Sequence, residues 1–403
     1  MLKLAFRNIF RNRLRTALTL LVIAIGVASI ILSGGFVQDV FVQLRETTIH
    51  SQIGHMQVFR EGYREFGRRD PARYVITRPQ EVRKALAAVP QVKEVLERVN
   101  FSGLASTGHA ELPILGEGVE PDKEARLGTA LTVVAGRQMR DGDTQGAMIG
   151  EGIANALGLK PGDFLTLIIS SPEGALNTLE YEITGIFRTF SKEYDERAVR
   201  IPLVSAKELI LNESAHSIAV LLENTAATAA ALEAASTKLV PLGYEVKPWH
   251  ELADFYSKTE ALYKRQFGAL QLIILVMLVL GVSSTINMVI HERTGEFGTL
   301  QAVGIRKREI FRMIVLENLL LGLVGSLVGV ATGVALAWAL TAVGIPMPPP
   351  PGSNTGYVAA IRIVGSVLAL AAATGMLAAV LASLLPARRA TQISIIQALR
   401  HNI

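Results

Sequence analysis

Residues 16–38, TALTLLVIAIGVASIILSGGFVQ, form an apolar run without a charged side chain, between Arg15 and Asp39. A helix rises about 1.5 Å per residue and the hydrocarbon core of a bilayer is about 30 Å thick, so roughly 20 such residues cross it. The run therefore predicts a membrane-spanning helix. The alternative is a cleavable signal peptide, but the run exceeds the usual apolar length of about 7–15 residues and no clear small-x-small cleavage site follows it.

Three further stretches pass the same test: residues 266–290, 318–343 and 363–387. Half of the 403 residues are hydrophobic, 19% are charged and the mean hydropathy is +0.36, which also favours a membrane protein. A charge at mid-membrane costs about 2.5–3.5 kcal/mol, and none of the four cores carries one. The spans thus offer no intramembrane proton or ion site, which counts against an ion-coupled carrier.

Basic residues gather before the first span, between the second and third, and after the fourth, whereas the segment between the third and fourth offers only Arg362. Under the positive-inside rule both termini are then cytoplasmic and residues 40–265 lie outside. The net charge of +5 indicates membrane-flanking charge rather than a nucleic-acid surface. The flanking residues are Lys3, Arg7, Arg11, Arg13 and Arg15; Arg293, Arg306, Lys307, Arg308 and Arg312; and Arg388, Arg389 and Arg400.

These patterns predict a membrane α-helical protein with one helix, a large insertion and then three helices. Near the start, apolar and basic residues fall on different helical faces, which suits an interfacial helix on anionic lipid. The predicted segments are a cytoplasmic interfacial amphipathic helix at 1–15, spans at 16–39, 266–290, 313–343 and 363–387, an extracytoplasmic domain at 40–265, a cytoplasmic coupling loop at 291–312, an extracytoplasmic proline-rich loop at 344–362 and a cytoplasmic tail at 388–403.

The predicted external domain mixes short alternating strands with short helices, which indicates an α+β domain with its own core. We expect a helix to begin near Pro79, because proline is tolerated in the first turn. Further helices are expected at 225–239 and at 250–265, the latter running into the second span. The expected strands are 53–59, 164–169, 180–187 and 198–203.

The sequence gives little sign of catalysis. It has no cysteine, which excludes disulfides, thiolate metal sites and cysteine nucleophiles. The histidines at 50, 55, 109, 216 and 250 lack metal-ligand spacing, and there is no GxSxG nucleophile motif. We therefore expect a non-catalytic membrane subunit without a metal or cofactor of its own.

The segment between the second and third spans, residues 292–312, reads ERTGEFGTLQAVGIRKREIFR. Glu296, Leu300 and Val303 share one face of a helix, and Gly304 is suited to end it before a second helix begins. The simple alternative is a charged loop that only fixes the topology.

Glycines recur in the third span at 325, 329 and 333, with Gly322 one turn earlier. Such small-residue spacing lets two helices approach closely. It names no partner, so packing within the chain and a dimer interface remain equal alternatives. In the fourth span Gly365, Ala369, Ala372, Gly375 and Ala379 form a possible matching surface.

The segment at 292–312 resembles the FtsX-like permease domain of MacB-type ABC transporters, whose pattern is ER-x-x-E-(F/I)-G-x-L-(Q/R)-A-x-G and then a basic cluster. Other stretches resemble the family in the same order along the chain. Residues 5–9 and 13–16 resemble its N-terminal segment, and residues 54–58 and 185–189 resemble parts of its external domain. Residues 347–352 resemble an outer loop of lipoprotein-release-like members, and residues 386–390 and 397–400 resemble its C-terminal signature. The resemblance covers essentially the whole chain.

The resemblance implies a permease in the bacterial inner membrane that works by mechanotransmission. Two permease chains would pair, as a homodimer or a related heterodimer, and each would dock on a separate ABC ATPase subunit that binds ATP and Mg²⁺. No GxxxxGK(S/T) phosphate loop occurs in this sequence, which makes its layout closer to the unfused lipoprotein-releasing LolC and LolE type. The implied ATPase-coupling residues are Glu292, Glu296, Phe297, Leu300, Gln301, Gly304 and Arg306.

Three functions stay open on the sequence. The first is release of lipoprotein or another amphipathic substrate from the outer leaflet, with a periplasmic carrier. The second is MacB-like efflux with a periplasmic adaptor. The third is FtsX-like activation of a cell-wall hydrolase, which ranks last because FtsX-type external domains are usually smaller.

Overall fold

The computed structural model describes residues 13–67, 73–127, 131–170, 176–189, 191–347 and 356–392. The chain divides into two units. A helical unit comprises residues 1–42, 260–346 and 358–403, and a β-rich domain comprises 43–259 and 347–357. The predicted helix at 1–15 lies outside the described residues except for Arg13–Arg15, and so do residues 348–355 of the proline-rich loop and residues 393–403 of the C-terminal tail.

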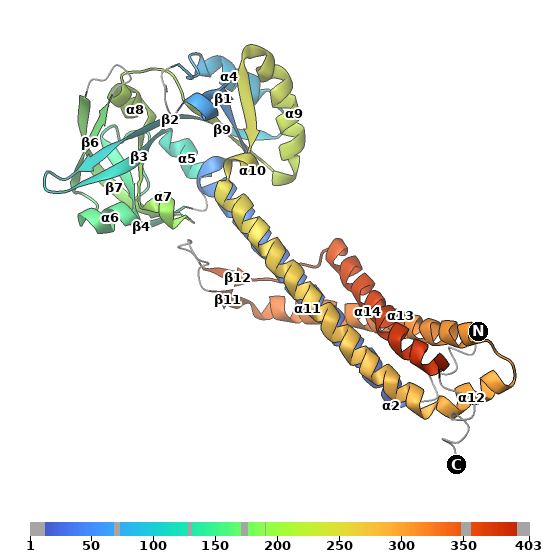
Figure 1. Cartoon of the computed structure of the whole chain (residues 1–403). Coiled ribbons are helices and arrows are strands. Elements are labelled where there is room, and N and C mark those ends of the chain that lie inside the picture. The colour runs from blue at the N-terminus through green and yellow to red at the C-terminus, as the bar shows by residue number, and fades with distance from the viewer. Residues whose placement is uncertain are drawn as a thin grey trace. The chain divides into compact units, whose positions relative to one another are not determined.

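In the part of the chain that the structure describes, four helices are long and apolar enough to cross a membrane: α2 (Arg13–Thr48), α11 (Asp254–Glu292), α13 (Lys307–Val343) and α14 (Gly365–Gln392) (Figure 1). They coincide with the four spans expected from the apolar runs. All four extend beyond those runs at one end or both, because polar residues outside the apolar cores continue the helices. The segment between the second and third of these helices contains the helix that was expected before Gly304, α12 (Thr294–Ala302), and then the first turns of α13.

The helical unit has an apolar core built around α2. Side chains of α2, α11 and α14 meet there, among them Ile23, Val27, Val282 and Ala379. Helix α2 lies along α11, since a methyl group at Gly281 would contact Val22 at 3.3 Å. These helices also carry many exposed large apolar side chains, such as those of Leu272, Met277 and Leu327, as expected of helices that face lipid.

The β-rich domain contains a closed ring of strands. β2 (Val92–Ser106) pairs with β3 (Glu111–Val119), and the pairing continues through β8 (Ala198–Pro202), β5 (Gly146–Gly150), β7 (Leu176–Arg188) and β6 (Phe164–Ser170) back to β2. Buried aliphatic side chains fill this ring, including Val99, Ile149, Leu167 and Ile201. Closure leaves few free strand edges.

The same sheet continues beyond the strand ring into a second part of the domain. The first half of β2 pairs with β9 (Ser217–Leu222), which pairs with β1 (Met56–Arg60) and then β10 (Tyr244–Pro248). Helices α4 (Pro79–Ala87) and α9 (Thr228–Leu239) cover this part of the sheet (Figure 1). The long strand β2 therefore belongs to both parts and joins their cores.

The structure confirms the predicted α+β character and most of the expected elements. Pro79 occupies the first turn of α4, as expected. The expected strands at 53–59, 164–169, 180–187 and 198–203 correspond to β1, β6, β7 and β8, and the helix at 225–239 to η2 (Thr225–Ala227) and α9. The helix expected at 250–265 breaks at Ala253, between α10 (Trp249–Leu252) and α11.

The remaining elements are short. They are η1 (Ile49–Ile53), α3 (Tyr63–Phe66), α5 (Pro121–Leu127), β4 (Thr132–Gly136), α6 (Glu151–Leu157), α7 (Lys192–Asp195), α8 (Leu203–Ile210), η3 (Val240–Leu242), β11 (Ile345–Met347) and β12 (Tyr357–Ala359).

Candidate coupling site

Helix α12 is a separate short helix at one end of the helical unit. It follows Arg293 and ends in a turn where Gly304 has φ +96°, a left-handed conformation that favours glycine. The N–H of Gly304 bonds to the carbonyl of Gln301, and the N–H of Ile305 bonds to that of Leu300. This is the Schellman ending of a helix, which the glycine at this position led us to expect.

One face of α12 is buried and the other is exposed. Thr294, Phe297 and Gly298 are buried, and Phe297 packs into the core of the helical unit. Toward the end of the helix Ala302 is exposed and the side chain of Val303 is 79% exposed. The exposed apolar side chains at this end are thus those of Ala302 and Val303.

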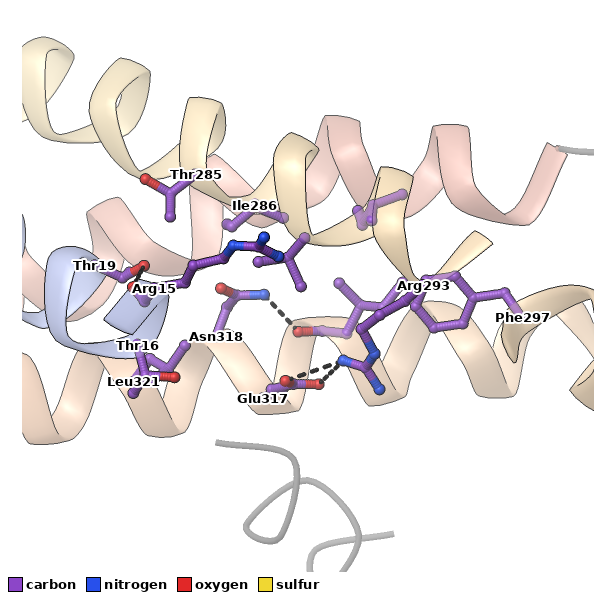
Figure 2. Close-up of a pocket in the computed structure, with 13 residues that line it drawn as sticks. Arg15, Thr16, Thr19, Thr285, Ile286, Arg293, Phe297, Glu317, Asn318 and Leu321 are labelled. Atoms are coloured by element: carbon purple, nitrogen blue, oxygen red, sulfur yellow. Dashed lines mark hydrogen bonds and ion pairs between the residues drawn. The ribbon is translucent and has the colours of Figure 1, made fainter. Parts of the chain in front are cut away.

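Arg293 anchors α12 to the long helices (Figure 2). Its Nη1 donates to both carboxylate oxygens of Glu317 on α13, at 3.1 and 3.2 Å, and its Nε donates to Glu296 at 3.1 Å. The guanidinium also lies 5.3 Å from the ring centre of Phe297. Because Arg293 is buried, these paired charges fix the angle at which α12 leaves α11.

A second ion pair joins the beginning of α2 to the end of α11, between Arg15 and Glu292. Arg15 and Arg293 line the same small cavity, of about 50 Å³ (Figure 2). Asn318 also lines it and donates a hydrogen bond to the carbonyl of Ile314. The polar groups at this end of the unit thus connect α2, α11, α12 and α13.

The structure places the seven predicted coupling residues in one short stretch but on different sides of it. Phe297 is buried and supports α12 from the inside. Glu292 and Glu296 belong to the ion pairs, and Leu300 and Gln301 are half-buried. Gly304 and Arg306 are exposed. Their role toward an ATPase stays a prediction.

The glycine stripe of α13 packs within the chain. A methyl group at Gly329 would lie 2.7 Å from Cβ of Val27 on α2, and methyl groups at Gly325 and Gly333 would lie about 3.0 Å from Ile23 and Ile31. Gly322 faces Ala379 on α14 in the same way. Of the two alternatives for this surface, intrachain packing is the one that the structure shows. Of the suggested matching surface on α14, Gly375 and Ala379 are buried, whereas Gly365 and Ala369 are exposed.

A buried charge cluster in the β-rich domain was missed by the sequence analysis. Arg98, Glu117, Glu124 and Arg200 come from three strands and one helix, and nothing in their spacing along the chain relates them. Burial opposes a charge on Glu117, but Arg200 and Arg98 hold the pKa of this carboxyl below its usual value. Among the described residues no group of three or more His, Asp or Glu side chains forms a metal site.

The fold and the site define a class of protein: a membrane protein with four spanning helices, an extracytoplasmic α+β domain between the first two, and a short helix between the second and third that is separately anchored. Two family models match the chain. The MacB-like periplasmic core domain matches residues 16–238, and the FtsX-like permease C-terminal domain matches residues 268–395. The chain belongs to this family of ABC transporter permeases.

Several named relatives are similar to this chain in sequence. The chain is 23% identical to the lipoprotein-releasing system transmembrane protein LolE of Haemophilus influenzae, over 65% of this chain and 64% of that protein. It is 24% identical to the uncharacterized ABC transporter permease YvrN of Bacillus subtilis, over 99% of both chains. It is 25% identical to the pyoverdine export ATP-binding/permease protein PvdT of Pseudomonas syringae, over 98% of this chain and 58% of that protein.

Among solved structures, the extracellular domain of the ABC-type transporter YknZ from Gram-positive bacteria is 17% identical, with a TM-score of 0.36, over 48% of this chain and 98% of that one. The four spanning helices and the LolE-like and LolC-like relatives point to the bacterial inner membrane.

Proposed function

We propose that this chain is the mechanotransmitting permease of an ABC transporter, and that α12 is the element that docks on the ATPase. The single observation that carries the proposal is the division of α12 into a buried face, anchored by Arg293, and an exposed end at Val303. A docking element needs both features, because force applied at the exposed end must reach the long helices.

The exposed end also has suitable charge. Arg306, Lys307 and Arg308 follow it directly and are exposed, and no ion pair with any described residue accompanies them. A basic rim around an apolar contact favours a partner with acidic residues around an apolar groove. In this proposal the α12 end is cytoplasmic, ATP and Mg²⁺ bind to a separate ATPase subunit, and the chain itself is not an enzyme. The similarity to YvrN, which is named as an ABC transporter permease and is matched over 99% of both chains, supports the permease role.

The docking step is tested with one pair of variants. Val303→Asp places a carboxylate on the proposed contact, and we expect it to weaken capture of the ATPase by the purified chain at least tenfold. Val204→Asp is the matched control, because Val204 is 75% exposed on α8 of the β-rich domain and outside the proposed contact. Equal capture of the ATPase by both variants would refute the assignment of α12.

For the substrate, we propose a lipoprotein or another lipid-linked amphipathic molecule taken from the outer leaflet. The support is the similarity to LolE and LolC, whose names describe lipoprotein release, and the Met-Pro-Pro-Pro-Pro-Gly stretch at 347–352. The test reconstitutes the chain with its ATPase and a triacylated lipoprotein. We expect the lipoprotein to stimulate ATP hydrolysis and to pass to a soluble acceptor, and the absence of both effects would exclude this substrate.

Efflux is the second candidate, favoured by the match to PvdT over 98% of this chain. A neighbouring gene that encodes a long-hairpin adaptor would favour efflux, whereas a gene for a LolA-like carrier would favour lipoprotein release. Either outcome leaves the docking role of α12 unchanged.

A further inference from the structure

The last turn of α2 belongs to the β-rich domain, and its residues Arg45–Thr48 are half-buried there. After Thr48 the helix passes into the π-helical turn η1, and Gly54 then turns the chain into β1 with φ +73°. Ile49 in this turn is fully buried, and it packs with Leu44, Trp249 and Tyr256. Because α2 is continuous from Arg13, η1 is the point where a candidate spanning helix ends inside the domain. π-helical turns are rare and frequently occur at functional sites.

Arg200 on β8 reaches this point directly. Its side chain is 2% exposed, and its Nη2 donates a hydrogen bond to the main-chain carbonyl of Ser51 in η1, at 3.3 Å. The rest of the guanidinium is held from other sides: Nε donates to Glu117 at 3.2 Å, Nη1 lies 3.5 Å from Glu124, and the ring centre of Phe187 is 5.4 Å away.

The groups that hold Arg200 are themselves fixed. Glu124 on α5 accepts from Arg98 on β2 at 2.6 Å, and Glu117 on β3 accepts from the hydroxyl of Tyr194 on α7 at 2.8 Å. Burial opposes the charge on Arg200, but Tyr194, Glu117 and Glu124 raise the pKa of its guanidinium above the ordinary value. The cluster holds two arginines and two glutamates, so their formal charges balance.

Stability alone gives a weak reason for such a cluster. Well-packed apolar side chains of similar volume often hold a core at least as well as a buried ion group does, because desolvation offsets most of the attraction. What a planar guanidinium adds is direction: it fixes several acceptors in one plane at defined angles. Here one of these acceptors belongs to η1, the turn that directly follows α2, and the others belong to β3 of the strand ring and to α5.

We propose that Arg200 is the residue that ties the movement of α2 to the strand ring of the β-rich domain. The proposal rests on the function proposed above, since a mechanotransmitting permease must pass movement from its membrane helices to its external domain. Arg200 is a positioning residue: it acts through the Ser51 carbonyl, and its loss should release η1 from the ring while both remain folded.

The variants separate this role from stability. Arg200→Met removes the hydrogen-bond donors of the guanidinium. Arg200→Lys keeps the positive charge but lacks the planar guanidinium, and it can be measured if Arg200→Met does not fold. Lys207→Met is the matched control. It removes a cation that lies 2.6 Å from the buried Glu97 in the same domain, but Lys207 is on α8 and its ion pair with Glu97 involves no residue of η1.

The first measurement needs no ATPase. Since the chain has no cysteine, Thr47→Cys at the end of α2 and Arg197→Cys at the start of β8 can carry a pair of spin labels. We expect one narrow distance distribution in the parent protein and in Lys207→Met, and a broad one in both Arg200 variants. A narrow distribution in the Arg200 variants, or equal broadening in Lys207→Met, would overturn the proposal.

The second measurement uses the complex with the ATPase and a single fluorescent label at position 197. We expect ATP and Mg²⁺ to change the label's emission in the parent protein and in Lys207→Met. In the Arg200 variants we expect this change to fall at least fivefold while the ATPase stays bound and active. An unchanged response in those variants would overturn the proposal. Failure of the parent protein to bind an ATPase would instead refute the proposed function, and the label distances would still decide the role of Arg200.

Discussion

The carboxylate of Asp39 on α2 lies 2.9 Å from Nε of Arg362, in the segment that leads into α14. Asp39 also accepts a hydrogen bond from the main-chain N–H of Ala360 at 3.1 Å, and it is almost completely buried. The N–H of Arg362 in turn bonds to the carbonyl of Gly35, one turn earlier on α2. These bonds fasten the segment before α14 to α2, at what we propose to be the outer end of the helical unit.

Asp39→Asn should loosen this attachment. The amide keeps the size of the side chain but loses the charge, and a hydrogen bond to a charged group contributes about 1.5–3 kcal/mol. We therefore expect a cysteine at Ala360 to react with a membrane-impermeant maleimide about tenfold faster in the Asp39→Asn background. Asp254→Asn, at the exposed start of α11, is the control and should leave the rate unchanged. Equal rates in all three backgrounds would contradict the prediction.

Gly329 allows α2 and α13 to approach closely. In Gly329→Ala the new methyl group would lie 2.7 Å from Cβ of Val27 and 3.0 Å from Cα of Ala24, which is main chain and has little freedom to move. Such overpacking costs about 1–3 kcal/mol. We expect a thermal midpoint several degrees lower for the detergent-solubilised chain, followed by circular dichroism.

Gly268→Ala is the control for this substitution, because a methyl group there would meet nothing within 4 Å. Alanine has the higher helix propensity, so Gly268→Ala should be neutral or slightly stabilising. A midpoint for Gly329→Ala equal to that of Gly268→Ala would show that the two helices separate without cost.

The spans and the α12 segment could be predicted because their signals are local. Each signal acts within a short stretch of the chain. The apolar run at 16–38 lies in α2, Gly304 ends α12 and Pro79 occupies the first turn of α4. The resemblance to a known family added the role of the segment, which local patterns alone did not supply.

The buried cluster could not be predicted, because its members meet only through the pairing of distant strands. Arg98 and Arg200 lie on β2 and β8, and each of these strands pairs with β3. No spacing along the sequence encodes that arrangement, and single charged residues in strands normally face solvent. Likewise, the glycines at 325, 329 and 333 contact α2 because α2 packs on α13, and their spacing in the sequence does not say which helix they contact.

His55 gives the β-rich domain a pH dependence. Its Nδ1 accepts from the N–H of Leu222 at 3.1 Å, so its Nε2 carries the proton and donates to Thr225 at 3.1 Å, and Thr225 donates to Glu46. Burial, together with the neighbouring His50, lowers the pKa of His55 from 6.5 to about 4. Burial lowers the pKa of His216 to about 4 as well.

Between pH 4 and 6.5 the unfolded chain therefore binds more protons at these sites than the folded chain does. Stability then rises with pH across this window, is complete above about 6.5 and is lost as the pH falls toward 4. Each histidine contributes on the order of 3 kcal/mol at most. His55→Gln, which keeps one acceptor and one donor, should reduce this slope, whereas His109→Gln, at an exposed turn, should not.

Tryptophan fluorescence measures this effect in the full chain. The protein has two tryptophans, and Trp338→Phe leaves Trp249, which is buried in the β-rich domain against Tyr256. We expect the thermal midpoint of this signal to fall between pH 7 and 4.5, and to fall less in His55→Gln. The same fall in both proteins would mean that His55 does not titrate in this window.

Gly304 should control the coupling of the chain to its ATPase in a graded way. Its φ of +96° suits glycine, is tolerated by asparagine and costs alanine about 1–2 kcal/mol. Proline fixes φ near −65° and removes the N–H that bonds to Gln301, so Gly304→Pro should displace the exposed end of α12. We expect the affinity of the chain for the ATPase to fall in the order Gly, Asn, Ala, Pro at position 304, while the amount of membrane-inserted chain stays constant.

Glu296→Lys, which places a second cation beside Arg293, should uncouple the chain from its ATPase as well. Normal transport by both Gly304→Pro and Glu296→Lys would show that α12 does not receive force from the ATPase, because the first change disturbs the end of α12 and the second its ion pair with Arg293.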